Sequence, residues 1–346
     1  MPTTLKDIAE RVGVSAQAVS LALHKEPGTA PISAALRERI VETARDMEYH
    51  PNRLARALAQ ARSRSVGLLM LALVDRPYAD ALRGVGDEAA AADYGVLLCC
   101  ADGQEAARRP LRTFVESRVV GIVAVATSRI GLADEVLARK PRAVPLVSIN
   151  REVRAKGVLS IVMDNYGAMQ RAVEHVIGSG HQRIAYFDVG SDPSTSSLGA
   201  FEASRERLDG YLAAMGSAGL EPLVRSLPWQ RPELRVAEAN RTTHALLTGP
   251  DTPSAFCAAT DYEALGALQA CLALGVRVPE DVALFGFDDQ EAGQLVSPVL
   301  SSVRQDFYAA GRLAVRRLLD WDAAMDGDVL RLDCQLVLRA SSPQPL

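Results

Sequence analysis

The stretch VGVSAQAVSLAL, residues 12–23, combines small residues with one long polar side chain, that of Gln17. A glutamine can hold adenine with two hydrogen bonds in the major groove of DNA, and a serine can bind a phosphate. Two alanines of the stretch, Ala16 and Ala18, are small enough to touch a thymine methyl group. The stretch therefore favours DNA reading with few polar contacts, and its alternative is a plain helix of a small bundle.

A second candidate for phosphate chemistry is YHPNRLARALAQARSRS, residues 49–65, which contains four Arg and no acidic residue. Unpaired arginines have little structural use but suit the phosphates of nucleic acid. Asn52 can cap a short helix that carries Leu54 and Leu58, yet such a helix is too short to be stable alone in water. We therefore expect a linker that folds when something holds it, and its charge argues against the plain bundle.

Three short helices are expected in residues 4–50 to position the first stretch. Thr4 and Asp7 fit a capping box at the first helix, and Ser15 is placed to cap the second. Gly13 permits a left-handed turn between these two helices without Cβ strain. This arrangement predicts a helix-turn-helix, in which the second helix lies in the major groove.

Charge is unevenly distributed along the 346 residues. Residues 1–65 carry ten Lys/Arg and seven Asp/Glu, a net charge of +3, which leaves 28 and 35 for residues 66–346, a net charge of −7. Hydrophobic residues make up 48% and charged residues 23%, so the composition is globular, and the length indicates two or three domains or lobes. A small basic head on an acidic body is typical of a tethered DNA-binding module.

From residue 66 onward, short apolar runs alternate with helical stretches. We expect strands at residues 66–71, 96–100, 119–125, 144–149, 183–187, 254–259 and 282–287. Strands that are apolar throughout indicate parallel sheets covered on both faces by helices. Because the runs form two sets, before and after about residue 160, we expect two α/β lobes with a ligand cleft at the carboxyl ends of their strands.

Cysteine and motif content argue against several other classes. The five Cys show no C-x-x-C spacing, so we expect no metal site and no cofactor, and an odd number of thiols in mostly apolar contexts fits a reducing cytoplasm. The first residues lack the apolar segment of a signal peptide, and no window reaches the about 18 apolar residues of a membrane helix. Gly84 and Gly86 do not complete a phosphate-binding G-x-G-x-x-G. We therefore expect a cytoplasmic protein without a membrane partner.

TLKDIAERVGVSAQAVSLAL and the later EYHPNRLARAL resemble the DNA-binding head of the LacI/GalR transcriptional regulators. The family's usual signature runs T-[IL]-x-D-[IV]-A-x-x-[AV]-G-V-S-x-x-T-V-S-R, followed later by G-Y-x-P-N-x-x-A-R-x-L. This sequence departs from it at Ala18, where Thr is usual, and at Leu21, where Arg is usual. The resemblance, together with the chemistry above, assigns DNA contacts to Thr4, Leu5, Ser15, Ala16, Gln17, Ala18, Ser20, Asn52, Arg53, Ala55, Arg56 and Leu58.

The resemblance also implies how DNA is bound. In the family, a homodimer places one head on each half of a pseudo-palindromic double-stranded operator, and paired hinge helices enter the minor groove. Leu58 matches the leucine that wedges into the central base step, where unstacking costs a few kcal/mol.

The body carries further matching blocks, among them VMDNYGAM (162–169), GHQRIAYF (180–187) and VPEDVALFGFDD (278–289). They resemble the family's two-lobed periplasmic-binding-protein-like core. The implied fold is α/β, with an N-terminal three-helix helix-turn-helix head plus a hinge helix, then two lobes with parallel sheets. We expect the domains to be a DNA-binding domain at residues 1–50, a hinge helix and linker at 51–65, and an effector-binding and dimerisation core at 66–346.

Family correspondence implies that a small-molecule effector contacts Pro77, Tyr78, Asn150, Met163, Arg207, Trp229, Thr260, Asp288 and Phe307. A polyol needs planar acceptors, a forked donor and an aromatic face, and Asp288, Asn150, Arg207 and Trp229 would supply them. A nucleobase would be better served by two flanking aromatic rings. The sequence therefore predicts a carbohydrate effector.

Several of these residues have structural alternatives. Asp288 or Asp289 could cap the following helix, and for Asp289 we prefer that interpretation. Arg207 could be a surface helix residue, and Trp229 could pack in a core. Asp261 is expected to be structural, as a residue in the first turn of a helix.

The predicted function is an effector-controlled transcriptional repressor with no enzymatic activity. A sugar-binding protein without a DNA role is the alternative, because the two lobes alone would permit it. A glycoside hydrolase using Asp288 and Asp289 is disfavoured, since adjacent residues cannot easily flank a glycosidic bond at the spacing of about 5–9.5 Å that such catalysis uses.

Overall fold

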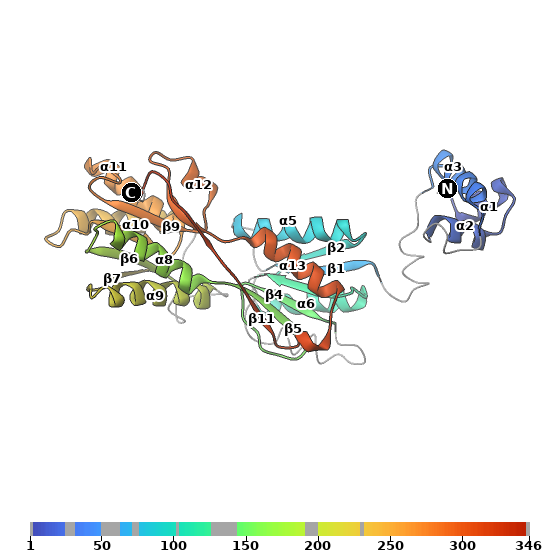
Figure 1. Ribbon diagram of the computed structural model, residues 1–346, viewed down its shortest axis with the longest axis horizontal. Helices are drawn as coiled ribbons and strands as arrows, with labels where there is room; N and C mark the ends of the chain where they lie inside the picture. Colours follow the sequence, from blue (N-terminus) through green and yellow to red (C-terminus); the bar gives the residue numbers. More distant parts are fainter. Residues whose placement is uncertain are drawn as a thin grey trace. The chain divides into compact units, whose positions relative to one another are not determined.

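A computed structural model of the chain describes residues 3–24, 32–49, 63–70, 76–101, 104–125, 144–190, 200–228 and 232–343 (Figure 1). Contacts divide the chain into two compact units, Met1–Ala61 and Arg62–Leu346. We describe each unit by itself and call the first the head and the second the core.

The described residues of the head form three helices, α1 (Leu5–Val12), α2 (Ala16–His24) and α3 (Ala34–Asp46). Thr4 and Asp7 form the predicted capping box, and Gly13 ends α1 in a left-handed conformation with φ 77°. The hydroxyl of Ser15 accepts a hydrogen bond from the amide of Ala18 at 3.1 Å, which caps α2 as predicted. The helices enclose a head cluster that consists of Ile8, Ala9, Val12, Val19, Ala22, Ile40 and Ala44.

The first lobe of the core is built on a six-stranded sheet with the order β11-β5-β4-β3-β1-β2. All its strand pairs are parallel. Helix α5 (Arg76–Ala91) packs against α13 (Phe307–Leu319) beside this sheet, and α6 (Gln104–Glu116) belongs to a separate apolar cluster. The strands are β1 (Ser65–Met70), β2 (Gly95–Cys100), β3 (Ile122–Val125), β4 (Leu146–Ile149), β5 (Val158–Met163) and β11 (Val329–Leu332).

The second lobe has a six-stranded sheet with the order β12-β10-β9-β8-β6-β7, in which only the edge strand β12 pairs antiparallel among the described strands. Its helices pack in two pairs, α8 (Asn165–Gly178) with α9 (Ala200–Ser217) and α10 (Pro232–Leu247) with α11 (Asp261–Leu274). A short α12 (Glu291–Gln294) follows β9. The strands are β6 (Ile184–Val189), β7 (Leu223–Leu227), β8 (Ala255–Ala258), β9 (Ala283–Phe287), β10 (Ser301–Arg304) and β12 (Gln335–Val337).

The chain passes between the lobes three times, after β5, after β10 and after β11. Figure 1 shows the result, with the red β11 lying beside the green β5 although the two are far apart in sequence. The amide of Asp164 donates to the carbonyl of Leu332 at 2.8 Å and so ties two of the crossings together. The three crossings bring strand ends of both lobes to one place.

The seven predicted strands are present, but the predicted division of the chain at about residue 160 is wrong for its C-terminal part. Helix α13 and strand β11 return to the first lobe, whereas β12 belongs to the second. Hydrophobic periodicity identifies a strand but says nothing about which sheet it joins, so the return was not visible in the sequence.

No helix in the described part of the chain is long and apolar enough to cross a membrane. Among the cysteines, Cys257, Cys271 and Cys334 are buried, but Cys100 is exposed. Its apolar sequence context suggested burial, and the exposure follows from its place on β2, an edge strand of the first sheet.

Candidate DNA-binding surface and effector cleft

Helix α2 presents a small polar surface. Val19 and Ala22 are buried in the head cluster, so the opposite side of the helix faces away from it. The side chains that the sequence nominated on this helix follow that division. Ser15, Ala16 and Gln17 are exposed, while Ala18 and Ser20 are half-buried.

The nominated residues of α1 also have structural partners. Thr4 is exposed, and its hydroxyl lies 2.8 Å from Oδ2 of Asp7, to which it donates. Hydrogen bonds from the backbone and side chain of Thr4 lower the pKa of the Asp7 carboxyl. Leu5 packs against the head cluster. A DNA contact by either residue stays a prediction, as does every assignment to residues 50–62 (Asn52, Arg53, Ala55, Arg56 and Leu58), which lie outside the described residues.

The effector residues nominated in the first lobe gather near the end of β4. Asn150 directly follows this strand and has a φ of 61°. This value lies in the left-handed region, which residues other than glycine seldom adopt. Its amide nitrogen lies 3.5 Å from the hydroxyl oxygen of Tyr78, whose ring meets that of Phe307 edge-on at 5.6 Å. Pro77 lies beside Tyr78 in α5, and Trp229 lies outside the described residues.

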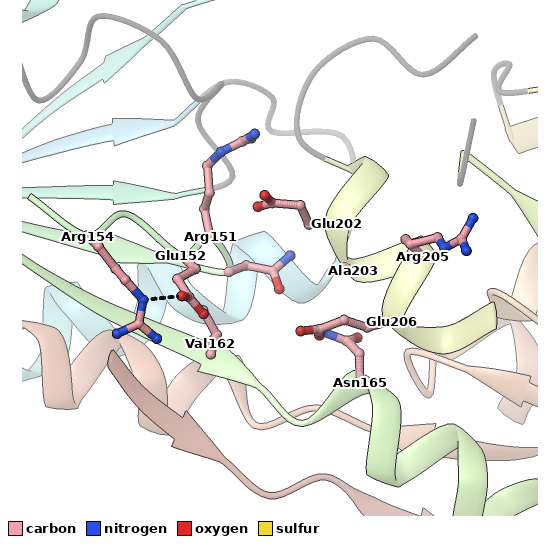
Figure 2. Close-up of a pocket in the computed structure, with 10 residues that line it drawn as sticks. Arg151, Glu152, Arg154, Val162, Asn165, Glu202, Ala203, Arg205 and Glu206 are labelled. Atoms are coloured by element: carbon pink, nitrogen blue, oxygen red, sulfur yellow. Dashed lines mark hydrogen bonds and ion pairs between the residues drawn. The ribbon is translucent and has the colours of Figure 1, made fainter. Parts of the chain in front are cut away.

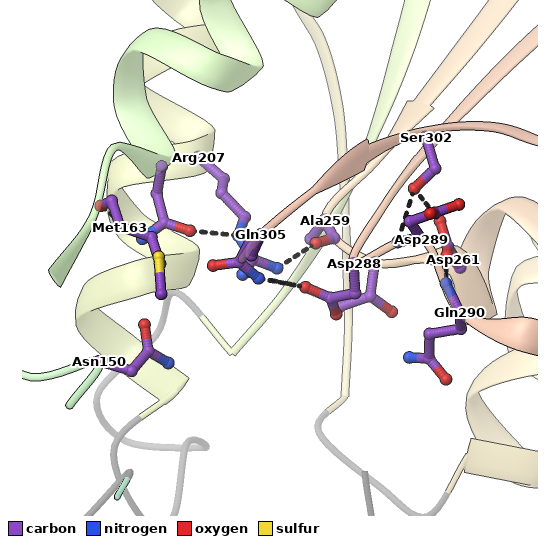
Figure 3. A network of polar contacts seen from close by, with 12 residues as sticks. Asn150, Met163, Arg207, Ala259, Asp261, Asp288, Asp289, Gln290, Ser302 and Gln305 are labelled. Carbon is purple, nitrogen blue, oxygen red and sulfur yellow. Dashed lines mark hydrogen bonds and ion pairs between the residues drawn. The ribbon is translucent and has the colours of Figure 1, made fainter. Parts of the chain in front are cut away.

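In the second lobe, Arg207 is the centre of a buried polar network (Figure 3). Its Nε donates to Oδ1 of Asn165 at 2.9 Å and its Nη1 donates to the carbonyl of Ala259 at 2.6 Å. Nη2 lies 3.3 Å from Oδ1 of Asp288, and the guanidinium stands 3.8 Å over the ring of Phe287. Arg207 is therefore no surface helix residue, because only 5% of it is exposed.

Asp288 follows β9 as Asn150 follows β4, and it too has a positive φ, of 98°. Backbone strain of this kind persists only where the surroundings enforce it, and it clusters at functional sites. Asp288 also accepts a hydrogen bond from Nε2 of Gln305 at 2.6 Å. The oxygen of this amide, Oε1, is buried without a hydrogen-bond partner among the described residues. Gln305 is thus a candidate effector residue. It was not nominated from the sequence, although it lies two residues before Phe307, which was.

Two nominated apolar residues, Met163 and Phe307, are almost completely buried. They belong to the large apolar cluster that runs through the core. Figure 3 shows Met163 between Asn150 and Arg207.

Thr260 has its hydroxyl committed within the protein. It is the N-cap of α11 in a capping box with Glu263, to which it donates at 2.7 Å, and it also bonds Nη2 of Arg235 at 2.7 Å. Arg235 and Glu263 are themselves a buried ion pair with 2.7 Å between Nε and Oε1. These contacts support a structural role for Thr260 and argue against a direct effector contact.

Asp261 occupies the first position of α11, as expected, and is fully buried. Its carboxylate accepts from the hydroxyl of Ser302 at 2.6 Å and from the amide of Gln290 at 2.5 Å. Burial raises the pKa of this carboxyl well above its usual value, and the hydrogen bond from Ser302 opposes the rise. The geometry agrees with the structural role that the sequence predicted.

Asp289 does not cap the following helix, so the preferred interpretation of this residue was wrong. The N-cap of α12 is Gln290, which makes no side-chain cap hydrogen bond. The carboxylate of Asp289 instead lies 2.7 Å from Nε of Arg304 and 2.6 Å from Nη2 of Arg339. Arg304 at the end of β10 and Arg339 just after β12 outcompete the helix amides, because a charged donor binds a carboxylate more strongly.

A cavity of about 550 Å³ opens between the loop after β4 and the first half of α9 (Figure 2). Of the nominated residues, only Asn150 lines it. No ligand role was predicted from the sequence for the charged residues around it. The lining consists of Asn150, Arg151, Glu152, Arg154, Val162, Asn165, Glu202, Ala203, Arg205 and Glu206.

One wall of the cavity is a chain of ion pairs that joins the lobes. Glu206 of α9 lies 3.3 Å from Nη1 of Arg331, which belongs to β11 of the first lobe. Arg331 also approaches Glu152 at 3.9 Å, and Glu152 pairs with Arg154 at 2.6 Å. In the described part of the chain, no group of His, Cys, Asp or Glu is arranged to hold a metal ion.

A three-helix head with an exposed polar helix and a two-lobed core with a cavity define the class of ligand-responsive DNA-binding regulators. Residues 4–52 match the family of bacterial regulatory proteins, lacI family, and residues 173–342 match the periplasmic binding protein-like domain. The ribose operon repressor of Escherichia coli (strain K12) is 30% identical over 322 residues, which are 91% of this chain and 92% of that protein. The chain therefore belongs to the LacI family.

Other relatives agree. The probable HTH-type transcriptional repressor ExuR of Bacillus subtilis (strain 168) is 29% identical and covers 91% of this chain and 90% of its own length. The lac repressor dimer bound to operator and the anti-inducer ONPF superposes with a TM-score of 0.78 at 25% identity, over 99% of each chain. The complex of the transcriptional regulator CelR with cellobiose gives 0.66 at 27% identity, over 98% of this chain and all of that one. The chain is a transcriptional regulator with a DNA-binding head, and its relatives are repressors rather than enzymes.

Proposed function

We propose that the protein is a homodimeric repressor that binds a pseudo-palindromic operator. A carbohydrate that binds between the lobes either releases the operator or tightens its binding. The observation that carries the effector part is the Arg207–Asp288–Gln305 network, in which Arg207 also bonds Asn165, two residues after the first-lobe strand β5. It offers a forked cationic donor, a carboxylate acceptor and an amide acceptor, which together suit vicinal hydroxyl groups.

The chemistry of relatives supports a sugar. One relative is named for a ribose operon, and a similar solved structure contains cellobiose. In this chain, the direct contacts that we propose come from Tyr78, Asn150, Arg207, Asp288 and Gln305, whose polar atoms lie around the strand ends. Thr260 is left out because its hydroxyl is engaged elsewhere.

Effector binding would act on DNA through the lobe arrangement. A ligand that contacts both lobes favours the arrangement in which all its contacts form, and it shifts the equilibrium by its difference in affinity for the two arrangements. Such coupling is typically about 1–3 kcal/mol. A change at the three crossings would then be transmitted to residues 50–62, where the predicted hinge helices meet DNA.

The test uses Asp288→Asn in the full chain. Asparagine tolerates a positive φ, so we expect the fold to be kept while the charged acceptor is lost. A thermal-shift screen of sugars and nucleobases should identify an effector of the natural protein, which at 100-fold over its Kd adds about 2.7 kcal/mol of stability. The variant should bind this effector at least about tenfold more weakly, since a hydrogen bond to a charged group contributes about 1.5–3 kcal/mol.

The matched control is Asp281→Asn, because Asp281 is an exposed aspartate that pairs with Arg277 away from the cleft. It should retain effector binding. Operator binding is measured in parallel by gel shift, with duplexes selected from genomic fragments. An unchanged effector affinity in Asp288→Asn would remove this residue from the site. Failure to select any duplex would instead favour a sugar-binding protein without a DNA role.

A further inference from the structure

Helix α2 carries a leucine on the side that faces away from the head cluster. At 100° per residue, Val19, Ala22 and Leu23 share one side of the helix, and all three are part of the head cluster or packed against it. Gln17 lies on the opposite side, and Leu21 is one turn further along the same side. Leu21 is only half-buried and is not among the described side chains that pack on the head cluster.

Leu21 therefore does not contribute to the apolar core of the head. The inner side of α2 supplies that core, and the outer side otherwise carries small or polar residues, from Ser15 to Ser20. In a helix-turn-helix the outer side of the second helix faces base edges in the major groove. The major-groove edges of the four bases carry one apolar group, the C5 methyl of thymine.

The spacing permits Gln17 and Leu21 to act on two different bases of one half-site. Four residues of helix span about 6 Å, and successive bases of one strand are about 3.4 Å apart, so the two side chains reach bases roughly two steps apart. Ala16 and Ala18 are small and leave room for close approach of the helix. We propose that Leu21 is a specificity-determining residue that recognises the 5-methyl group of one thymine in each operator half-site.

This inference rests on the proposed DNA-binding function and adds the chemistry of one base position to it. A polar side chain at position 21 would instead bind the hydrogen-bonding atoms of a base. Leucine makes no hydrogen bond, so its preference for thymine depends on the methyl group itself. Deoxyuridine has the same hydrogen-bonding atoms as thymidine and lacks only that methyl, which makes it a direct probe.

The experiment begins with the full-length protein and a random duplex library, from which a preferred operator is selected. Each thymine of the half-site is then replaced by deoxyuridine, and binding is measured by competition. One position per half-site should weaken binding about fourfold, as expected for one buried methyl group. In Leu21→Ala, thymine and deoxyuridine should bind equally at that position. Leu21→Arg should move the preferred base toward guanine there.

Val41→Ala is the matched control, because Val41 is an apolar residue of α3 that is 38% exposed. This variant should keep the methyl dependence. The deoxyuridine replacements are measured with the natural protein. Their result therefore does not depend on whether a variant folds. If the protein selects no duplex, the proposed function fails. If it selects one but tolerates deoxyuridine at every thymine, or if Leu21→Ala keeps the methyl dependence, only the role of Leu21 is overturned.

Discussion

Arg207 shows how a buried charge stays available to a ligand. Its contacts with Asn165 and Ala259 are 2.9 and 2.6 Å long, whereas its approach to Asp288 is 3.3 Å. Because the contact with Asp288 is the longest, a ligand hydroxyl can replace it with the smallest loss of interaction energy. Oε1 of Gln305, buried without a partner among the described residues, is an acceptor for the same hydroxyl or its neighbour. The network therefore holds its charge in place and keeps capacity for one or two further hydrogen bonds.

Asp261 provides a prediction about pH. Its pKa is raised well above the usual value because the carboxyl is fully buried. The folded state therefore holds the proton at pH values where the unfolded chain has released it. The stability from this group is complete below the unfolded pKa of about 3.8 and is lost as pH rises through the folded pKa. Asp261→Asn removes this dependence, so its unfolding free energy should fall less between about pH 5 and about pH 8 than that of the natural protein.

The measurement is urea unfolding of the full chain at both pH values. Asp281→Asn serves as the control, because a hydrogen bond from Arg277 lowers the pKa of Asp281 to about 2. The stability from Asp281 is present throughout this range and is lost only as pH falls through its folded pKa of about 2, so the change in unfolding free energy between about pH 5 and about pH 8 should be the same in this variant as in the natural protein. An equal fall with pH in Asp261→Asn and the natural protein would show that Asp261 does not titrate in this range.

At the scale of elements, glycines set how closely the helix pairs approach. A Cβ atom at Gly84 of α5 would overlap the carbonyl oxygen of Tyr308 in α13, and one at Gly311 of α13 would overlap that of Ala81 in α5. Gly210 makes the same kind of approach from α9 to α8. These helices therefore cross backbone to backbone. The GVG at residues 84–86 did not complete a phosphate-binding motif. The close contact between the helices explains why its first residue is glycine.

Gly311→Ala should consequently destabilise the core by about 1–3 kcal/mol, the usual cost of overpacking a tight contact. Gly86→Ala is the matched change, because a Cβ there meets nothing within 4 Å. It should stabilise the chain by about 0.5–1 kcal/mol, since alanine favours a helix interior over glycine. Unfolding by urea distinguishes the two. Equal effects of the two substitutions would contradict a backbone contact between α5 and α13.

Local signals predicted elements well and their partners poorly. Apolar runs located the strands, and Thr4, Ser15 and Gly13 located helix ends, because both depend on neighbours along the chain. The cavity lining was missed at Glu202, Arg205 and Glu206, whose charges on a helix look like any solvated surface. What makes them part of a site is the first lobe opposite them, and that proximity arises only from the three crossings. The positions of Asn150 and Asp288 at strand ends were the part of the site that local sequence could indicate.

At the scale of the whole core, the Arg331–Glu206 pair is a side-chain contact that joins the two lobes. Arg331 lies on β11 of the first lobe and Glu206 on α9 of the second, so the 3.3 Å contact depends directly on the lobe arrangement. Their side chains are 42% and 36% exposed. Solvent screening therefore limits the pair to about 0–1 kcal/mol, which is still enough to shift an equilibrium between two lobe arrangements several-fold.

We therefore expect Glu206→Gln and Arg331→Gln to change operator affinity in the same direction, each by at most about fivefold. The double variant should be no further from the natural protein than either single one, because residues that act through one contact are not additive. Gel-shift titrations with a selected operator measure all four proteins, and added salt should reduce the differences. Glu238→Gln is the control, since Glu238 pairs with Arg241 within α10 and joins no lobes. Additive effects of the two substitutions, or an equal effect of the control, would mean that this pair does not couple the lobe arrangement to DNA binding.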